Sequence, residues 1–227
     1  MVETFAAGRR QWLWRQHADA VNAELVARWL PADPVSRVLK TDLFDEAVGA
    51  GLYPCLSARA RVVTGIDVSP AVVNAATARY PGLDAKVADV RRLPFEPATF
   101  NAIVSNSTLD HFDSFGEIKT SVGELHRVLA PRGDLLLTLD NARNPIVALR
   151  GCLPGSALRW IGALPAYVGE TCGPRALRRL LESTGFEVYE LTAVLHCPRA
   201  PAVAAARLFE CATRPTRQRF LKALAAW

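Results

Sequence analysis

Residues 61–70 read RVVTGIDVSP, from Arg61 to Pro70. The β-branched residues at its start predict a buried parallel strand that ends at the carboxylate of Asp67. Ser69 and Pro70 then predict the N-cap and the first residue of a helix. Both oxygens of a carboxylate can accept hydrogen bonds, so an acid at the carboxyl end of such a strand suits the two hydroxyls of a ribose. The stretch therefore predicts an α/β fold with a nucleoside contact at Asp67.

Composition and charge narrow the class of protein. The 227 residues are 50% hydrophobic and 22% charged, which is typical of a globular chain with one main domain. The formal net charge of +5 comes mostly from arginines spread along the sequence, and this argues against a nucleic-acid partner. Five widely spaced cysteines without a Cys-x-x-Cys pair predict neither a disulfide framework nor a metal site. Without a signal-peptide core or an apolar run of ~18 residues, we expect a cytoplasmic protein with no membrane span.

Segments with the periodicity of strands and helices alternate along the chain. This alternation predicts a doubly wound, mostly parallel sheet. An N-terminal helix is predicted over residues 9–30, because its apolar residues recur at steps of three and four. Strands are predicted at residues 36–41, 61–67, 85–90, 100–107, 134–140 and 186–194. Further helices are predicted at 52–60, from Pro70 to about Tyr80, at 118–129, from Gly173 to Gly185 and, with a break at Pro215, at 202–227.

Polar side chains fall at the carboxyl ends of the predicted strands. They are Asp42, Asp67, Asp89 and Asn106. Ligands of doubly wound sheets bind beyond these strand ends, where the strand order reverses. A random scatter of acids would not produce this placement, and it favours a nucleoside cofactor.

With these residues in place, residues 36–194 resemble the class I S-adenosylmethionine-dependent methyltransferases, especially small-molecule members of the UbiE-like type. The stretch RVVTGIDVSP resembles the second motif of that family, and VADVRRLPF, residues 87–95, resembles the segment that contacts adenine. The stretches FNAIVSNSTLDHF and ELHRVLAPRGDLLLTLDN resemble its fourth and fifth motifs. Each match alone is weak, but together they are fairly specific.

The resemblance implies a Rossmann-like fold and S-adenosyl-L-methionine as cofactor, with S-adenosyl-L-homocysteine as product. It assigns the ribose hydroxyls to Asp67, with Val68 beside it. It assigns the adenine amino group to Asp89, with the amide of Val90 beside it. Asn106 is expected to line the pocket near the methionine part or the methyl acceptor.

The first motif departs from the family. In place of a G-x-G-x-G turn, residues 42–51 read DLFDEAVGAG, so the glycines come late. In one interpretation this loop, including Leu43 and Phe44, closes on the cofactor, and Asp42, Asp45 or Glu46 faces its cationic ammonium and sulfonium. In the other, the loop fills part of the pocket and weakens cofactor binding. We favour the first, because acids remain at two other strand ends. Asp45 and Glu46 could also be solvated acids in the first turn of a helix.

The candidate catalytic pair is His111 with Asp110. Methyl transfer from a sulfonium needs alignment and, for some acceptors, a base. His111 would act as that base, and Asp110 would orient it or raise its pKa. The alternative is that His111 is structural.

The domain organisation has three parts. They are an N-terminal helical extension (1–34), a methyltransferase domain (35–195) with a lid insertion at about 141–173, and a C-terminal helical segment (196–227). The lid offers Trp160 and Tyr167 as candidate acceptor-binding residues, and the N-terminal helix offers Trp14 and His17. Such a lining favours a hydrophobic or aromatic small-molecule acceptor. The alternative is that these side chains only pack or form a dimer face, and a homo-oligomer is compatible with the sequence.

The C-terminal segment forms a basic amphipathic pattern with three interpretations: an ordinary packed helix, which we favour, a helix with weak membrane-surface association, or a helix that binds an acidic partner. For the whole chain, two readings compete with a methyltransferase. One is a methyltransferase-like binding protein that has lost its cofactor. The other is an NAD-dependent oxidoreductase. The absence of a G-x-G-x-x-G motif after the first predicted strand argues against it.

Overall fold

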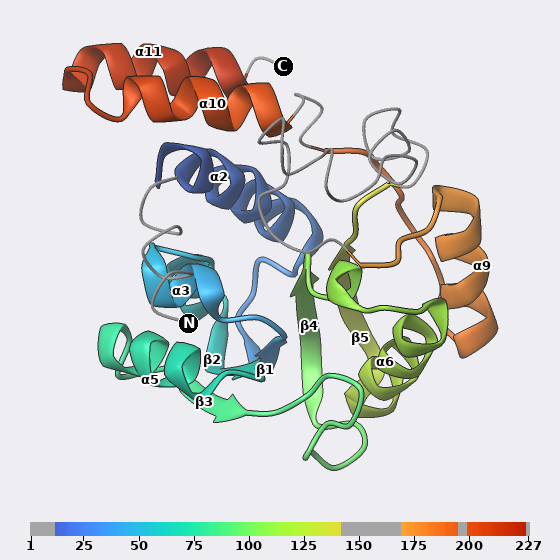
Figure 1. The fold of residues 1–227 in the computed structure, drawn as a ribbon. Coiled ribbons are helices and arrows are strands. Elements are labelled where there is room, and N and C mark those ends of the chain that lie inside the picture. The colour runs from blue at the N-terminus through green and yellow to red at the C-terminus, as the bar shows by residue number, and fades with distance from the viewer. Residues whose placement is uncertain (1–11, 142–168, 195–198, 226–227) are drawn as a thin grey trace. The chain divides into compact units, whose positions relative to one another are not determined.

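The computed structural model describes residues 12–141, 169–194 and 199–225 (Figure 1). The chain forms two compact units, which are described separately. The first unit comprises Met1–Val87 and Ala193–Trp227, and the second comprises Ala88–Thr192.

The first unit is built on three parallel strands in the order β3-β2-β1. β2 carries the predicted stretch and is buried from Val63 to Asp67. The elements in chain order are α2 (Trp12–Trp29), β1 (Val35–Lys40), α3 (Phe44–Val48), α4 (Tyr53–Ser57), β2 (Ala60–Asp67), α5 (Pro70–Arg79), β3 (Asp84–Val87), α10 (Arg199–Phe209) and α11 (Arg214–Ala225).

The second unit is built on the parallel strands β4 and β5, in a register that pairs Asn106 with Thr138. Ser114 caps α6, because its Oγ accepts a hydrogen bond from the Glu117 amide at 3.3 Å. The elements in chain order are β4 (Phe100–Asn106), the short 3₁₀ helix η1 (Leu109–His111), α6 (Phe115–Val128), β5 (Leu129–Thr138) and α9 (Pro174–Thr184).

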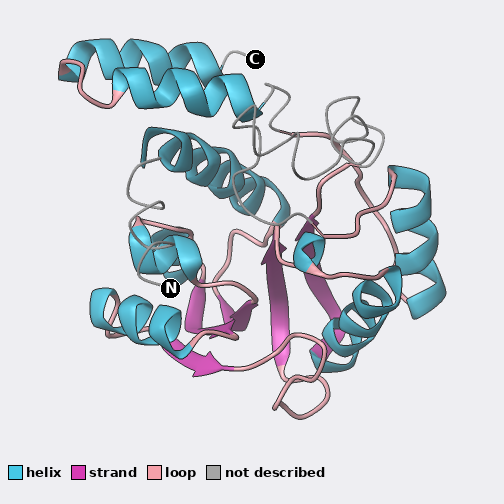
Figure 2. Cartoon of the chain, viewed as in Figure 1, coloured by secondary structure: helices cyan, strands magenta, loops and turns pink. Residues whose placement is uncertain are grey.

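The fold class is α/β with parallel strands, as predicted (Figure 2). α9 ends as expected, because Gly185 takes a left-handed φ of 109° that glycine adopts without strain. No helix in the described ranges is long and apolar enough to cross a lipid bilayer.

The predictions for three regions were wrong, namely residues 42–60, the start of β5 and residues 186–194. The loop expected at 42–51 contains the helix α3, and the helix expected at 52–60 is limited to Tyr53–Ser57. β5 starts at Leu129 rather than at residue 134, because the stretch around Arg132 forms a bulge between the pairs Phe100–Leu129 and Ala102–Asp134.

The third wrong prediction is the strand at 186–194, which runs as a loop (Figure 2). Its alternating apolar residues suggested one buried face. In the structure Tyr189 is 82% exposed and Leu191 is 41% exposed, so this alternation buries little apolar surface.

Candidate functional site

Asp67 is the last residue of β2, and backbone amides hold its carboxylate in place. Oδ1 accepts a hydrogen bond from Ser69 N at 2.8 Å, and Oδ2 accepts one from Leu43 N at 3.3 Å. The side chain is only 9% exposed. A carboxylate has about four acceptor positions, so these two amides leave capacity for the hydroxyls of a ligand.

The loop after β1 approaches this strand end through Leu43 rather than through glycines of its own. Leu43 is fully buried, and its side chain lies over Gly65 of β2. A Cβ atom at Gly65 would lie 2.5 Å from Leu43 Cδ2. The close approach that the family obtains from a glycine-rich loop is therefore obtained here from a glycine in the neighbouring strand.

A buried ion pair fixes the same loop. Lys40 Nζ lies 2.9 Å from Glu46 Oε2, and the two side chains are 1% and 0% exposed. Lys40 Nζ also donates to the carbonyl oxygen of Asp42. Glu46 Oε1 accepts the amides of Leu52 at 2.7 Å and Tyr53 at 3.2 Å, at the start of α4. Glu46 is therefore not a solvated residue, and its carboxylate joins β1, α3 and α4.

The late glycine of this loop has a defined role. Gly51 has a φ of +59°, and a Cβ atom there would lie 2.4 Å from the Glu46 carboxylate. Its amide donates to Asp19 Oδ2 of α2 at 3.2 Å. Gly51 thus lets the chain pass over the buried ion pair.

Carboxylates outnumber cations around this loop. Asp19, Asp42, Asp45, Glu46 and Asp67 contribute to one electrostatic cluster, in which Arg15 pairs with Asp45 and Lys40 pairs with Glu46. Arg15 also lies over the Phe44 ring, 4.7 Å from its centroid. The excess of negative charge fits a ligand with cationic groups, such as the ammonium and sulfonium of S-adenosylmethionine.

Burial and like charges shift the pKa values of two of these acids. Burial, followed by the charges of Asp45 and Glu46, raises the pKa of Asp19 to about 7. Burial also raises the pKa of Asp42 to about 6, although Lys40 acts in the opposite direction. Asp42 keeps some solvent exposure, but its Oδ1 accepts the Phe44 amide at 3.0 Å and starts α3.

The second unit places Asn106 at the end of β4 and Asp110 in η1. Each side chain is 6% exposed, and the Oδ1 atom of each has no hydrogen-bond partner among the described residues. Burial raises the pKa of Asp110, His111 lowers it, and Asp140 raises it further. His111 is exposed, so the buried titratable group of the predicted pair is Asp110.

The chain that returns from the insertion packs on η1. Gly169 N donates to Asp110 O at 2.8 Å, and Glu170 N donates to Phe112 O at 2.6 Å. A Cβ atom at Gly169 would lie 2.0 Å from Phe112 O, so only glycine fits this approach. The predicted lid residues Trp160 and Tyr167 lie outside the described residues.

Asp89 lies in the turn after β3, two residues beyond the end of that strand, and not at the strand end as predicted. Its two oxygens each accept Arg91 Nε at 3.0 Å, and this hydrogen bonding lowers the pKa of Asp89. Arg91 also pairs with Glu117 and lies over the Phe112 ring. Val90 is buried next to it. The predicted contact of Asp89 with adenine stays a prediction.

The remaining predicted residues belong to the first unit. Trp14 is 6% exposed and packs with Leu13 against α10, which is the packing role that the sequence also allowed. His17 is buried next to Trp14, and burial lowers its pKa. Val68 is 67% exposed. The acceptor-binding role of Trp14 and His17 stays a prediction.

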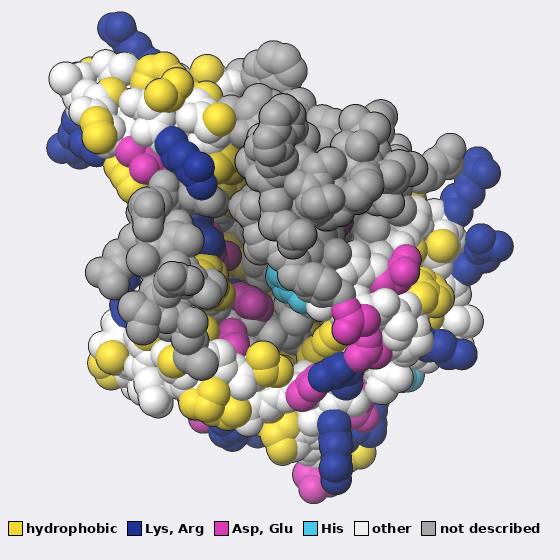
Figure 3. All heavy atoms as spheres, viewed as in Figure 1, with side chains coloured by type: hydrophobic (Ala, Val, Ile, Leu, Met, Phe, Trp, Pro, Cys, Tyr) yellow, Lys and Arg dark blue, Asp and Glu magenta, His cyan; other side chains and the backbone are white. Residues whose placement is uncertain are grey.

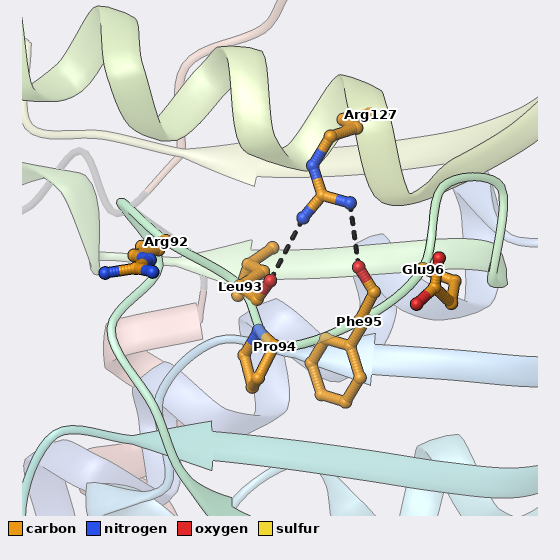
Figure 4. Close-up of a pocket in the computed structure, with 6 residues that line it drawn as sticks. All are labelled: Arg92, Leu93, Pro94, Phe95, Glu96 and Arg127. Atoms are coloured by element: carbon orange, nitrogen blue, oxygen red, sulfur yellow. Dashed lines mark hydrogen bonds between the residues drawn. The ribbon is translucent and has the colours of Figure 1, made fainter.

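A hollow in the second unit contains none of the predicted residues (Figure 4). Arg127 of α6 closes it by donating to Leu93 O at 3.0 Å and to Phe95 O at 2.7 Å. Glu124 holds the same guanidinium at 2.7 Å. These contacts clamp the loop that enters β4, and we assign the hollow no function.

Comparison with known proteins shows similarity to methyltransferases in sequence and in fold. Residues 44–137 match the family described as methyltransferase domain. The cyclase SpnF has a TM-score of 0.60 at 24% identity, over 90% of this chain and 71% of SpnF. The N-methyltransferase NodS of Bradyrhizobium japonicum, solved with S-adenosyl-L-homocysteine, has a TM-score of 0.52 at 17% identity, over 71% of this chain and 72% of NodS. These structures share the Rossmann-like methyltransferase fold.

Two relatives extend the match in sequence. A probable S-adenosylmethionine-dependent methyltransferase of Mycolicibacterium smegmatis is 29% identical over 156 residues, which are 68% of this chain and 55% of that protein. Phthiotriol/phenolphthiotriol dimycocerosates methyltransferase 1 of Mycobacterium ulcerans is 34% identical over 101 residues, 42% of this chain and 35% of that protein. The chain thus spans about half the length of the first relative and about a third of the second. In its matched domain and in its fold the chain is similar to S-adenosylmethionine-dependent methyltransferases.

Proposed function

We propose that this chain transfers a methyl group from S-adenosylmethionine to a small hydrophobic or aromatic acceptor. The observation that carries the proposal is the carboxylate of Asp67, which two backbone amides hold at the end of β2 with acceptor capacity left for a ribose. The excess of acids around the loop after β1 supports a cationic cofactor. The bound cofactor would supply an activated methyl carbon that needs no metal or redox partner of the protein.

The residues of this chain would then bind and orient the cofactor. In the proposal Asp67, with Val68 beside it, holds the ribose hydroxyls, and Asp89 with the Val90 amide holds the adenine. Because Arg91 occupies both oxygens of Asp89, this contact requires the guanidinium to shift or to share the carboxylate. Asp42, and Asp45 with its partner Arg15, would face the cationic end of the cofactor, whereas Glu46 is fully buried in its ion pair with Lys40.

Proton removal from the acceptor is assigned to the second unit. We propose that Asp110 and His111 act together, as the sequence suggests, and that Asn106 orients the acceptor. The unpartnered oxygen of the buried Asp110 and the raised pKa of this carboxyl support a direct role in accepting a hydrogen bond or a proton. The exposed His111 would then pass the proton to solvent.

The name of the Mycobacterium ulcerans relative supports the hydrophobic acceptor, because that protein is a lipid methyltransferase. One observation favours a second candidate function. A structure with this fold is a cyclase, so the fold does not require methyl transfer. The alternative is therefore a protein that binds the nucleoside without transferring its methyl group.

Calorimetry and turnover separate these functions. We expect micromolar binding of S-adenosylhomocysteine and no binding of NAD. We also expect release of S-adenosylhomocysteine from S-adenosylmethionine when hydrophobic or phenolic acceptors are screened. Binding without turnover across that screen would favour the non-catalytic alternative, and binding of NAD alone would overturn both.

A further inference from the structure

The positive charge of the chain is concentrated in its last two helices. Six of the 27 basic residues and one of the 22 acidic residues lie between positions 199 and 225. The rest of the chain therefore carries 21 basic and 21 acidic residues and has no net formal charge. The hairpin of α10 and α11 therefore accounts for the whole net charge of +5. A description of the arginines as spread along the sequence does not detect this concentration.

The apolar side of this hairpin packs against α2 within the first unit. Ala202, Val203 and Ala206 of α10 are buried against Leu13 and Trp14 of α2. The aromatic rings of the hairpin, Phe209 and Phe220, stack on each other with centroids 4.7 Å apart. Packing on α2 therefore sets which side of the hairpin is left at the surface.

The outer side carries basic residues and one large apolar side chain. Arg207, Arg214, Arg219 and Lys222 are exposed, and Leu208 is 81% exposed. Figure 3 shows dark blue Lys and Arg side chains and yellow hydrophobic side chains over α10 and α11, at the upper left of the view. Among the described residues Arg214, Arg219 and Lys222 make no hydrogen bond or ion pair through their side chains.

The hairpin carries a single acid, Glu210. Glu210 accepts hydrogen bonds from the backbone amides of Trp12 and Leu13, at the start of α2. Burial raises the pKa of Glu210, and the charge of Arg207 acts in the opposite direction. Glu210 thus offsets part of the charge of Arg207, and the formal net charge of the hairpin stays at +5.

We propose that the α10–α11 hairpin docks this protein on an anionic membrane surface. The basic side chains would lie against the lipid phosphates, and Leu208 would enter the interface between headgroups and acyl chains. A nucleic acid fits less well, because single strands are held by exposed aromatic rings. Phe209 and Phe220 stack on each other, and Arg217 lies over the ring of Trp12, which is 39% exposed. Docking of this kind would bring the site toward acceptors that partition into lipid.

The test is vesicle co-sedimentation with the full chain. We expect binding to phosphatidylcholine vesicles only when they contain phosphatidylglycerol, and a steep loss of that binding at high salt. Arg219→Gln with Lys222→Gln should weaken binding roughly 25-fold, at about fivefold for each cation near the surface. Leu208→Ser should weaken it further without removing the dependence on phosphatidylglycerol.

The matched control is Arg175→Gln with Arg179→Gln, because both arginines are exposed on α9 and the change in net charge is the same. This control should bind vesicles like the unmodified chain, and all variants should bind S-adenosylhomocysteine alike. If the hairpin variant does not fold, the proposal is tested by the Arg219→Lys variant, which keeps the charge and should bind vesicles like the unmodified chain. The salt dependence of vesicle binding by the unmodified chain is then the second test. Equal binding to vesicles with and without phosphatidylglycerol, equal losses in both double variants, or tighter binding to an oligonucleotide than to vesicles would overturn the proposal.

Discussion

The loop after β1 and the end of β4 both place buried carboxylates at a strand end, but they treat them differently. In the loop, Glu46 is matched by Lys40 and by two backbone amides. At the end of β4, Asn106 and Asp110 each keep a buried oxygen without a partner among the described residues. Glu46 Oε2 also lacks a hydrogen bond, but the Lys40 ammonium lies 2.9 Å from it and compensates its charge. A buried acid with a counter-charge stabilises a shape, whereas a buried polar atom with neither a counter-charge nor a donor lowers stability unless a ligand completes it. The first region therefore holds the backbone that supports Asp67, and the second is the better candidate for contact with a reacting group.

The largest loss of stability is expected from Lys40→Met. This change leaves Glu46 buried without its cation and should lower the free energy of unfolding by about 3–5 kcal/mol. Urea titration measures it. The control Lys86→Met breaks an exposed pair with Asp84 and should cost about 0–1 kcal/mol. Adding Glu46→Gln to Lys40→Met should restore much of the loss, since the amide oxygen can still accept from Leu52. Equal losses for Lys40→Met and Lys86→Met would contradict this account of the loop.

The next effect tests how Leu43 approaches β2. Gly65→Ala places a Cβ atom against a buried side chain and should cost about 1–3 kcal/mol. It should also weaken S-adenosylhomocysteine binding, because Leu43 moves away from Asp67. The matched change Gly123→Ala meets nothing within 4 Å in α6, and it should stabilise the chain by up to about 1 kcal/mol. Thermal unfolding measures the stability of both variants, and calorimetry measures their affinity for S-adenosylhomocysteine. Unchanged affinity in Gly65→Ala would argue against the claim that Leu43 positions Asp67.

Neutralising the Asp110 carboxylate, after β4, should raise the stability of the folded state, whereas the two changes above lower it. Asp110→Asn removes a buried charge near Asp140 and should stabilise the folded state by about 1 kcal/mol at neutral pH. The same variant should bind S-adenosylhomocysteine normally and lose methyl transfer. Glu46→Gln, in contrast, should destabilise. If both substitutions destabilise, the two regions do not differ in the way described.

The smallest effect is a pH dependence of stability. The folded state raises the pKa of Asp19 from 3.8 to about 7, so it binds more protons than the unfolded chain in that window. The contribution of Asp19 to stability should therefore fall as the pH rises from about 4 to about 7. Asp19→Asn should flatten that part of the profile in urea titrations at a series of pH values. A profile that is unchanged by the substitution would count against the raised pKa.

Much of the architecture was predictable from the sequence because local signals agreed with the fold. Pro70 starts α5, Gly185 ends α9, and Asp67 lies at the end of a strand, as their residue types suggest. The buried ion pair was not predictable, because a lysine and a glutamate six positions apart look like solvated residues. Gly51 was the signal for it, since it marks a close approach to Glu46 that another side chain would block. Gly65 marks the close approach of Leu43 to β2 in the same way.

The failures share a physical cause. The strand expected at 186–194 runs as a loop, and the exposure of Tyr189 shows that β-favouring residue types without a partner surface do not make a strand. The candidate site was predicted as a list of strand-end residues. Which of them would already be engaged, such as Asp89 with Arg91, depends on side chains that only the folded chain brings together.

The most direct test of the central claim is the affinity of S-adenosylhomocysteine for Asp67→Ala, measured by calorimetry beside Asp33→Ala, an exposed acid of the same unit. The account predicts micromolar binding to the Asp33 variant and to the unmodified chain, with a loss of at least 100-fold, about 2.7 kcal/mol, in the Asp67 variant. Equal affinity in both variants would contradict the assignment of Asp67 to the nucleoside.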